Sequence, residues 1–288
     1  MKSNKIVTTI ILLGVLTGVI LTCNPKADVA TGMISVLHTN DIHSQVLPVA
    51  KDKGRWGDYG GFSRIAHVVD SIKSSRGEVL LLSCGDFCQG TPFFNFFGGK
   101  TEVDFMNKIG YTATTLGNHE FDNGMESLAD VIRMSNFPYV VSNYDFSQTP
   151  LSGLVEPSHM VNYQGVKVGL IGLTVDISTL VSKENGVGAV YLDPVKSAQQ
   201  WTDTLLSRGA DVVICMSHLG DREYMGRVGD VELAAATSGI DVILGGHSHV
   251  DMIKVVKNNK GEDVTITQVA SQGRLLGEVN IFMGSKEE

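Results

Sequence analysis

Short apolar runs that stop abruptly at polar residues recur along the chain. They are ISVLH before TNDIH, EVLLLS before CGDFCQG, TATTL before GNHE, DVVICM before SHLG, and DVILGG before HSH. Runs of about four to eight residues that are rich in Val, Ile and Leu and bounded by Gly or Asp are typical of buried strands. We therefore expect strands whose ends deliver polar side chains.

Helical patterns separate several of these runs. Residues 63–74 place Ile65, Val68, Val69 and Ile72 on one face, and similar patterns predict helices over 125–134, 194–206 and 231–237. Near the end, MIKVVKNNKGEDVTITQVA alternates around an Asn-Asn-Lys-Gly turn, which indicates a hairpin. Interleaved strands and helices with a late antiparallel pair predict an α/β fold.

The strand ends carry a set of residues with metal-binding chemistry: Asp41, His43, Asp86, Asn118, His119, His218, His247 and His249. Five of the chain's eight histidines are in this set. Each motif alone would suit a solvated loop. Together they favour a site, because an open α/β sheet can bring its strand ends to one rim. Nitrogen and carboxylate ligands suit Zn, Mn or Fe better than Mg or Ca.

Small residues and isolated polar residues have simpler interpretations. Glycines at 85, 117, 245 and 246 are expected to let the backbone approach the site without a Cβ in the way. The isolated histidines and the three later cysteines are expected to be structural: His38, His67, His159, Cys84, Cys88 and Cys215. We expect the aromatic run FFNFF, residues 93–97, to serve mainly in packing.

The N-terminus has the pattern of an export signal. Lys2 and Lys5 precede an apolar run, residues 6–22, although a retained membrane anchor has the same composition. Cys23 directly follows the run, and VILTC resembles a bacterial lipoprotein signal in which that cysteine is lipidated. We therefore predict a signal peptide over 1–22, a linker over 23–33 and one domain over 34–288. The chain would be exported to the periplasm or cell surface, and held at a membrane only through this signal or anchor.

The charge excludes one class of partner. The formal net charge is −8 over 288 residues, and an acidic surface repels nucleic acid. An anionic substrate would need a local positive source, which a bound metal can provide.

The ordered motifs D-x-H, G-D, G-N-H-E, H and G-H-x-H resemble the calcineurin-like metallophosphoesterase signature. Within that superfamily, GDFCQGTPFFNFFGGKTEVDFMNKIGYTATTLGNHEFDNG resembles the 5'-nucleotidase family. The resemblance runs from about Ile34 to GRLLGEVNIF. It implies a four-layer α/β/β/α sandwich with two mixed sheets.

The resemblance also implies a role for each motif residue. Asp41, His43 and His249 would bind one divalent ion, Asn118, His218 and His247 a second, and Asp86 would bridge the two ions, which would be Zn, Mn or similar. His119 would face the substrate phosphate, and Asp122 would orient its imidazole. Glu120 belongs to the motif but is expected to be structural.

The implied activity is hydrolysis of nucleoside 5'-monophosphates or related phosphomonoesters by metal-activated water. In the family a second domain supplies the aromatic pair and the arginines that hold the nucleoside, and we expect this half in a separate chain or not at all. The alternatives are 2',3'-cyclic phosphodiesterase, UDP-sugar hydrolase or thiosulfohydrolase activity, and a non-catalytic surface interaction module.

Overall fold

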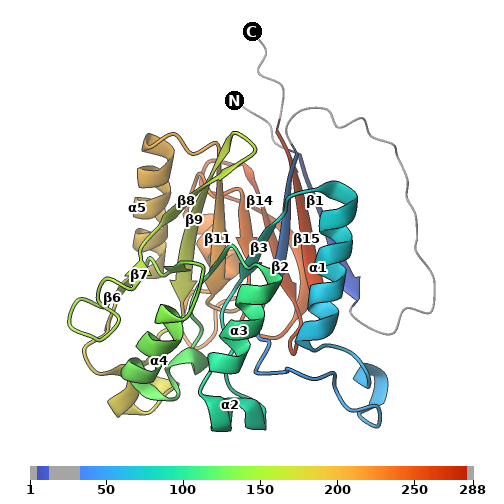
Figure 1. Cartoon of the computed structure of the whole chain (residues 1–288). Helices are drawn as coiled ribbons and strands as arrows, with labels where there is room; N and C mark the ends of the chain where they lie inside the picture. The colour runs from blue at the N-terminus through green and yellow to red at the C-terminus, as the bar shows by residue number, and fades with distance from the viewer. Residues whose placement is uncertain (1–4, 13–32, 284–288) are drawn as a thin grey trace.

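Two β-sheets packed face to face, with helices on both outer faces, make up the computed structural model, which describes residues 5–12 and 33–283 (Figure 1). One sheet has seven strands in the order β1 (Lys5–Leu12), β15 (Leu275–Phe282), β2 (Met33–Thr39), β3 (Leu80–Ser83), β4 (Ala113–Thr114), β5 (Tyr139–Val140) and β7 (Val155–Glu156). The other has six in the order β13 (Asp251–Lys257), β14 (Asp263–Val269), β12 (Val242–Leu244), β11 (Val212–His218), β9 (Val166–Thr174) and β8 (His159–Tyr163). A small third sheet pairs β6 (Tyr144–Asp145) with β10 (Val190–Tyr191).

Both large sheets are mixed. In the first, β2, β3, β4, β5 and β7 are parallel while β1 and β15 are antiparallel to their neighbours. In the second, β9, β11, β12 and β14 are parallel, and β8 and β13 run the other way at the edges. The carboxyl ends of the parallel strands therefore meet at one end of the molecule, the lower end in Figure 1.

The helices cover the two outer faces. The outer face of the seven-stranded sheet packs against α1 (Phe62–Arg76), α2 (Pro92–Phe97), α3 (Lys100–Ile109) and α4 (Gly124–Arg133). The outer face of the six-stranded sheet packs against α5 (Pro194–Ser207) and α6 (Asp230–Ala236). Single 3₁₀ turns lie at η1 (Gly54–Trp56), η2 (His119–Phe121), η3 (Ile177–Thr179) and η4 (Lys183–Gly186).

Successive side chains of a strand point to opposite faces of its sheet, and this explains how the four layers pack. On β2, Val36 packs between the two sheets while its neighbour Leu37 packs under the helices. On β11, Met216 faces the core between the sheets and Cys215 faces the helices on the other side. Strands with both faces buried read as continuous apolar runs, which is why the sequence shows them so clearly. The predicted α/β/β/α architecture is confirmed.

The predicted elements are present with small shifts in their ends, and some elements were missed. The four predicted helices correspond to α1, α4, α5 and α6, and the predicted hairpin to β13 and β14. The adjacent helices α2 and α3 were not predicted, because Gly98 and Gly99 interrupt the apolar period between them. The expectation for the aromatic run was partly wrong. Phe94 is buried, but Phe96 and Phe97 are 82% and 52% exposed because a six-residue helix buries only one side.

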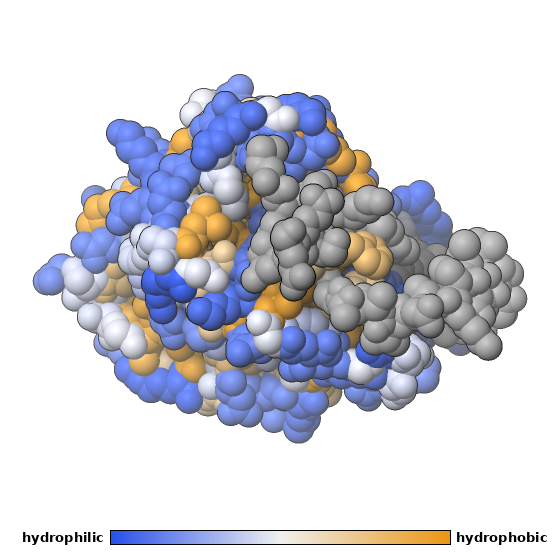
Figure 2. Space-filling model, turned by 90° about the horizontal axis from the view of Figure 1, so that it is seen from above, coloured by the Kyte–Doolittle hydropathy of each residue, from blue (hydrophilic) through white to orange (hydrophobic). Residues whose placement is uncertain are grey.

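Part of the predicted signal segment lies in the described structure. Residues 5–12 form β1, which pairs with β15 along its whole length. Cys23 and the rest of the segment lie outside the described residues, so cleavage and lipidation stay predictions. Within residues 5–12 and 33–283 no helix is both long and apolar enough to cross a bilayer. The upper end of the molecule, seen in Figure 2, has a mainly hydrophilic surface with small hydrophobic areas among the polar ones.

Candidate metal centre

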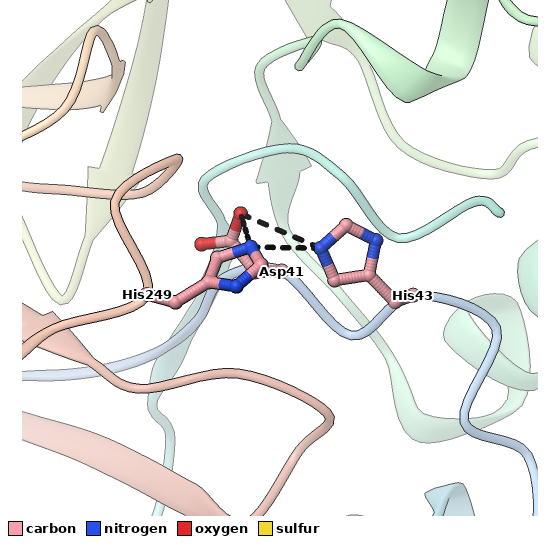
Figure 3. Close-up of side chains that lie close together, drawn as sticks. All are labelled: Asp41, His43 and His249. Carbon is pink, nitrogen blue, oxygen red and sulfur yellow. Dashed lines mark hydrogen bonds and ion pairs between the residues drawn. The ribbon is translucent and has the colours of Figure 1, made fainter. Parts of the chain in front are cut away.

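Asp41, His43 and His249 point toward one another although they lie on distant parts of the chain (Figure 3). Asp41 and His43 follow β2, and His249 lies between β12 and β13. The Nε2 atoms of His43 and His249 are 2.9 Å apart, and Nε2 of His249 is 3.2 Å from Oδ1 of Asp41. One ligand atom from each residue lies within 4.8 Å of the others, so the three could hold one ion.

A second group of the same kind lies next to the first. Asp86 follows β3, His218 ends β11, and His247 follows β12. Nε2 of His218 is 3.0 Å from Oδ2 of Asp86 and 3.9 Å from Oδ1 of Asp41. Asp86, His218 and His247 again offer ligand atoms within 4.8 Å of one another.

Asp86 lies between these two groups. It also belongs to a third group, with His43 and His119, that meets the same distance limit. Asp86 is therefore within reach of ligands from both sides, the position a bridging carboxylate requires. His119, expected to be free of metal, lies close enough to Asp86 and His43 to be a neighbour of any ion held there.

Unpaired polar atoms test whether the residues fit a metal. Asn118 is buried and its Oδ1 has no hydrogen-bond partner in the described structure. His218 donates from Nδ1 to the carbonyl of Cys84 at 2.6 Å, so Nε2, which lies 3.0 Å from Oδ2 of Asp86, is the ring atom that could bind a metal in exchange for its proton. A buried amide oxygen without a partner is costly, and coordination would satisfy Oδ1 of Asn118. The donor set of carboxylate, imidazole and amide oxygen fits a divalent ion of the Zn, Mn or Fe type.

The backbone at the site is held in an unusual conformation. Asp41, His43, Asp86, His247 and His249 have φ between 51° and 72°, the left-handed region. Non-glycine residues rarely adopt it, and where they do at a cluster of polar groups a functional constraint is the usual reason. The surrounding structure holds these residues in place: for example, Asp41 donates from its N–H to the carbonyl of Gly85 at 3.0 Å.

The glycines do what the sequence predicted. A Cβ built at Gly117 would lie 2.1 Å from Oδ1 of Asp86, and one at Gly246 would lie 2.8 Å from Nδ1 of His218. At Gly85 a Cβ would lie 2.4 Å from the backbone nitrogen of Gly117. The backbone therefore approaches a candidate ligand closely at Gly117 and Gly246, and approaches another backbone segment at Gly85.

The histidines of the site differ in the direction of their pKa shifts. Burial disfavours the charged form of His218, but the carboxylate of Asp86 outweighs it and raises the pKa of His218 to about 10. Burial, followed by repulsion from His218, lowers the pKa of His247 to about 4. Burial also lowers the pKa of His43. The site thus combines two imidazoles that favour the neutral form with a buried ion pair of Asp86 and His218. A bound metal ion could replace the proton that this pair shares.

His119 and Asp122 form a separate pair at the edge of the cluster. Nδ1 of His119 is 2.7 Å from Oδ2 of Asp122, and the two side chains are partly exposed. Partial burial lowers the pKa of His119, but the hydrogen bond to Asp122 outweighs it, and the net shift is upward. The backbone N–H of His119 donates to Oδ1 of Asp86 at 2.9 Å. This imidazole is placed to carry a proton beside the cluster.

Glu120 has the structural role that was expected. Its carboxylate is buried and accepts hydrogen bonds from the backbone N–H groups of Asp86, Gly117 and Cys88 at 2.8, 2.6 and 3.0 Å. One side chain therefore holds two loops that carry site residues.

Two supporting residues were missed in the sequence. Asn40 donates from Nδ2 to Oδ2 of Asp41 at 2.6 Å and to the carbonyl of Ala270 at 2.8 Å. Gln268 donates to the carbonyl of Gly246 and accepts from the N–H of Val250, so it holds the segment that carries the last two histidines. The position of Asn40 beside Asp41 was the only signal for these roles in the sequence.

Comparison with known proteins agrees with this geometry. The family model described as Calcineurin-like phosphoesterase matches residues 34–251. The chain belongs to this family. Family membership places it among hydrolases that act on phosphoric esters.

Relatives of the calcineurin-like phosphoesterase include 5'-nucleotidases. A snake venom 5'-nucleotidase of Gloydius brevicauda is 32% identical over 275 residues, covering 88% of this chain and 46% of the relative. A 5'-nucleotidase of Bos taurus is 30% identical over 276 residues, with 88% and 47% covered. Among solved structures, a 5'-nucleotidase precursor from Thermus thermophilus has a TM-score of 0.79 and 34% identity, covering 86% of this chain and 51% of that one. The phosphoesterase therefore spans about half the length of these proteins.

Proposed function

We propose that the chain hydrolyses nucleoside 5'-monophosphates and related phosphomonoesters at a centre of two divalent ions. The observation that carries the proposal is the arrangement of the ligand groups, in which Asp86 belongs to one group with His43 and to another with His218 and His247. The names of the relatives supply the nucleotide, because the venom, bovine and Thermus proteins are all called 5'-nucleotidases.

The ligands divide between two ions in this proposal. Asp41, His43 and His249 hold the first, Asn118, His218 and His247 hold the second, and Asp86 serves both. The free Oδ1 of Asn118 and the short distance between the Nε2 atoms of His43 and His249 support this division. Divalent ions held there supply Lewis acidity, which polarises phosphoryl oxygens and lowers the pKa of water.

The protein itself supplies proton transfer. Because Nδ1 of His119 is engaged by Asp122, Nε2 is the atom left to give a proton. The raised pKa of His119 favours the charged imidazolium, which stabilises negative charge on the phosphoryl group and protonates the leaving oxygen. Asp122 holds the ring in one orientation throughout.

Metal content and phosphate release from AMP test the proposal on one preparation. The purified chain should retain about two divalent ions per molecule, and release phosphate from AMP when loaded with Mn²⁺ or Zn²⁺. Asp86→Asn should lose both properties, while the exposed Asp104→Asn serves as a control that loses neither. Metal retention without any phosphate release would contradict the hydrolase proposal.

We also propose that the chain works outside the cytoplasm, anchored at Cys23, and that a second chain supplies nucleoside-binding residues. The leader sequence supports the first point, and a relative from venom agrees with it. The relatives support the second point, because they are about twice as long as the matched region. Addition of a separately expressed partner half should raise kcat/KM for AMP without changing metal content.

A further inference from the structure

A hollow lies directly beside the candidate metal centre. Its volume is about 380 Å³, and His247, one of the candidate ligands, forms part of its wall. Val175 and Leu219 supply apolar side chains, while Arg222, Tyr224 and Arg227 come from the loop between β11 and α6. Because His247 borders both spaces, a group attached to a phosphate at the centre can extend into the hollow.

The loop presents two of these residues as a pair. Tyr224 and Arg227 exchange both backbone hydrogen bonds, with N–O distances of 3.1 and 3.0 Å. Met225 and Gly226 form the tip with φ of 52° and 78°, as a type I′ turn requires. Residues directly opposite each other in such a hairpin place their side chains on the same face. Tyr224 and Arg227 therefore stand side by side at the hollow.

The loop is fixed in place before any ligand arrives. The N–H of Asp221 donates to Oγ of Ser248 at 3.1 Å, and the N–H of Glu223 donates to a carboxylate oxygen of Glu232 at 2.6 Å. The guanidinium of Arg227 donates to the hydroxyl of Thr179. A loop held in this way loses little conformational entropy on binding.

The exposed aromatic ring is otherwise unexplained. Tyr224 is 73% exposed although it borders a hollow that Val175 and Leu219 line together with charged residues of the loop. A flat ring beside a guanidinium provides stacking and cation–π contacts for a planar heterocycle. The volume also lies within the range of about 300–1,000 Å³ that is usual for small-molecule sites.

We infer that this hollow is a leaving-group subsite belonging to the metal domain itself, and that Tyr224 and Arg227 hold the base of a nucleoside phosphate there. The inference rests on the proposed function for its substrate class. It adds that part of the nucleoside specificity lies in the metal domain, in addition to what a second half contributes.

Binding of adenosine tests the subsite without any turnover. In equilibrium dialysis with labelled adenosine, Tyr224→Ala should weaken binding about tenfold, since stacking on one aromatic side chain has about that effect. Tyr224→Phe should stay within about twofold of the wild type. Met225→Ala is the matched control, because Met225 is 82% exposed on the same turn but does not line the hollow. Absence of adenosine binding by the wild type, or equal weakening by Tyr224→Ala and Met225→Ala, would overturn the inference.

Kinetics with two esters separate the subsite from the reaction. Tyr224→Ala should lower kcat/KM for AMP about tenfold, and change kcat/KM for methyl phosphate by less than about twofold. An equal loss with both esters contradicts the subsite and leaves the hydrolase intact. Failure of the wild type to release phosphate from either ester contradicts the proposed function, while the dialysis result still decides whether the hollow binds the base.

Discussion

The carboxylate of Glu120 accepts a hydrogen bond from the backbone N–H of Asp86 at 2.8 Å, and this contact joins the two loops at the middle of the candidate metal centre. Burial, followed by repulsion from Asp86, raises the pKa of Glu120 to about 7. The carboxyl group tolerates burial because three backbone donors surround it.

Glu120→Ala should therefore leave three buried N–H groups without an acceptor. Each unsatisfied donor costs about 1–3 kcal/mol, so we expect a large drop in the free energy of unfolding and a loss of retained metal. Urea unfolding and metal analysis measure the two effects. Glu126→Ala, on the exposed first turn of α4, is the control. Full metal retention by Glu120→Ala would contradict the positioning role.

Asp122→Asn should reduce catalysis while sparing the metals. The carboxylate raises the pKa of His119, so its removal lowers that pKa, and the protonated imidazole disappears at a lower pH. The alkaline limb of the kcat profile should move to lower pH, and kcat should fall by about 10²–10⁴ if His119 acts as general acid. Phosphate release over a pH range of about 5–9 gives the profile. An unchanged alkaline limb would exclude His119 as the proton donor.

Gly117→Ala should disable the centre with a single methyl group. The new Cβ would lie 2.1 Å from Oδ1 of Asp86. That oxygen cannot move away without losing its hydrogen bond from the backbone N–H of His119. We expect loss of bound metal and of activity, measured by metal analysis and phosphate release. Gly186→Ala is the matched control, because its Cβ would meet only Ile177 at 3.6 Å. Normal metal content in Gly117→Ala would contradict the steric requirement for glycine beside Asp86.

His38 should make the protein sensitive to acid. Burial between the sheets lowers the pKa of His38 from 6.5 to about 3, and neither ring nitrogen has a partner in the described structure. The unfolded chain takes up a proton below about pH 6.5 and the folded one does not, so stability falls as pH falls from 6.5 toward 3. At about pH 5 the expected loss from this group is about 2 kcal/mol.

Replacement of His38 by Leu tests this effect. The difference in unfolding free energy between about pH 7 and about pH 5, from urea titrations, should shrink by about 2 kcal/mol in His38→Leu. His159→Leu is the control, because His159 is only half-buried and pairs with Glu156. An equal effect of the two substitutions would contradict the assignment to His38.

The sequence predicted the fold and the site where an apolar strand pattern ends directly at a metal-binding type of residue. Apolar strands such as β11 end at His218, so the run predicts the strand and the residue at its end predicts the site. The sequence was uninformative where contacts join distant segments. Asn40 bonds the carbonyl of Ala270, 230 residues away, and no local pattern indicates that contact. The pair Tyr224 and Arg227 was missed because its turn, Met225 and Gly226, lacks the usual Asn-Gly signal.

The left-handed conformation of Asp41, His43, Asp86, His247 and His249 gives the centre a thermodynamic character of its own. Each such residue is less stable than glycine would be there, by about 1–3 kcal/mol. Selection for folding alone would therefore favour replacement of these candidate ligands by glycine, one at a time. Because the chain holds all five side chains in strained positions, an ion bound by them would offset a destabilisation that the fold carries in its absence.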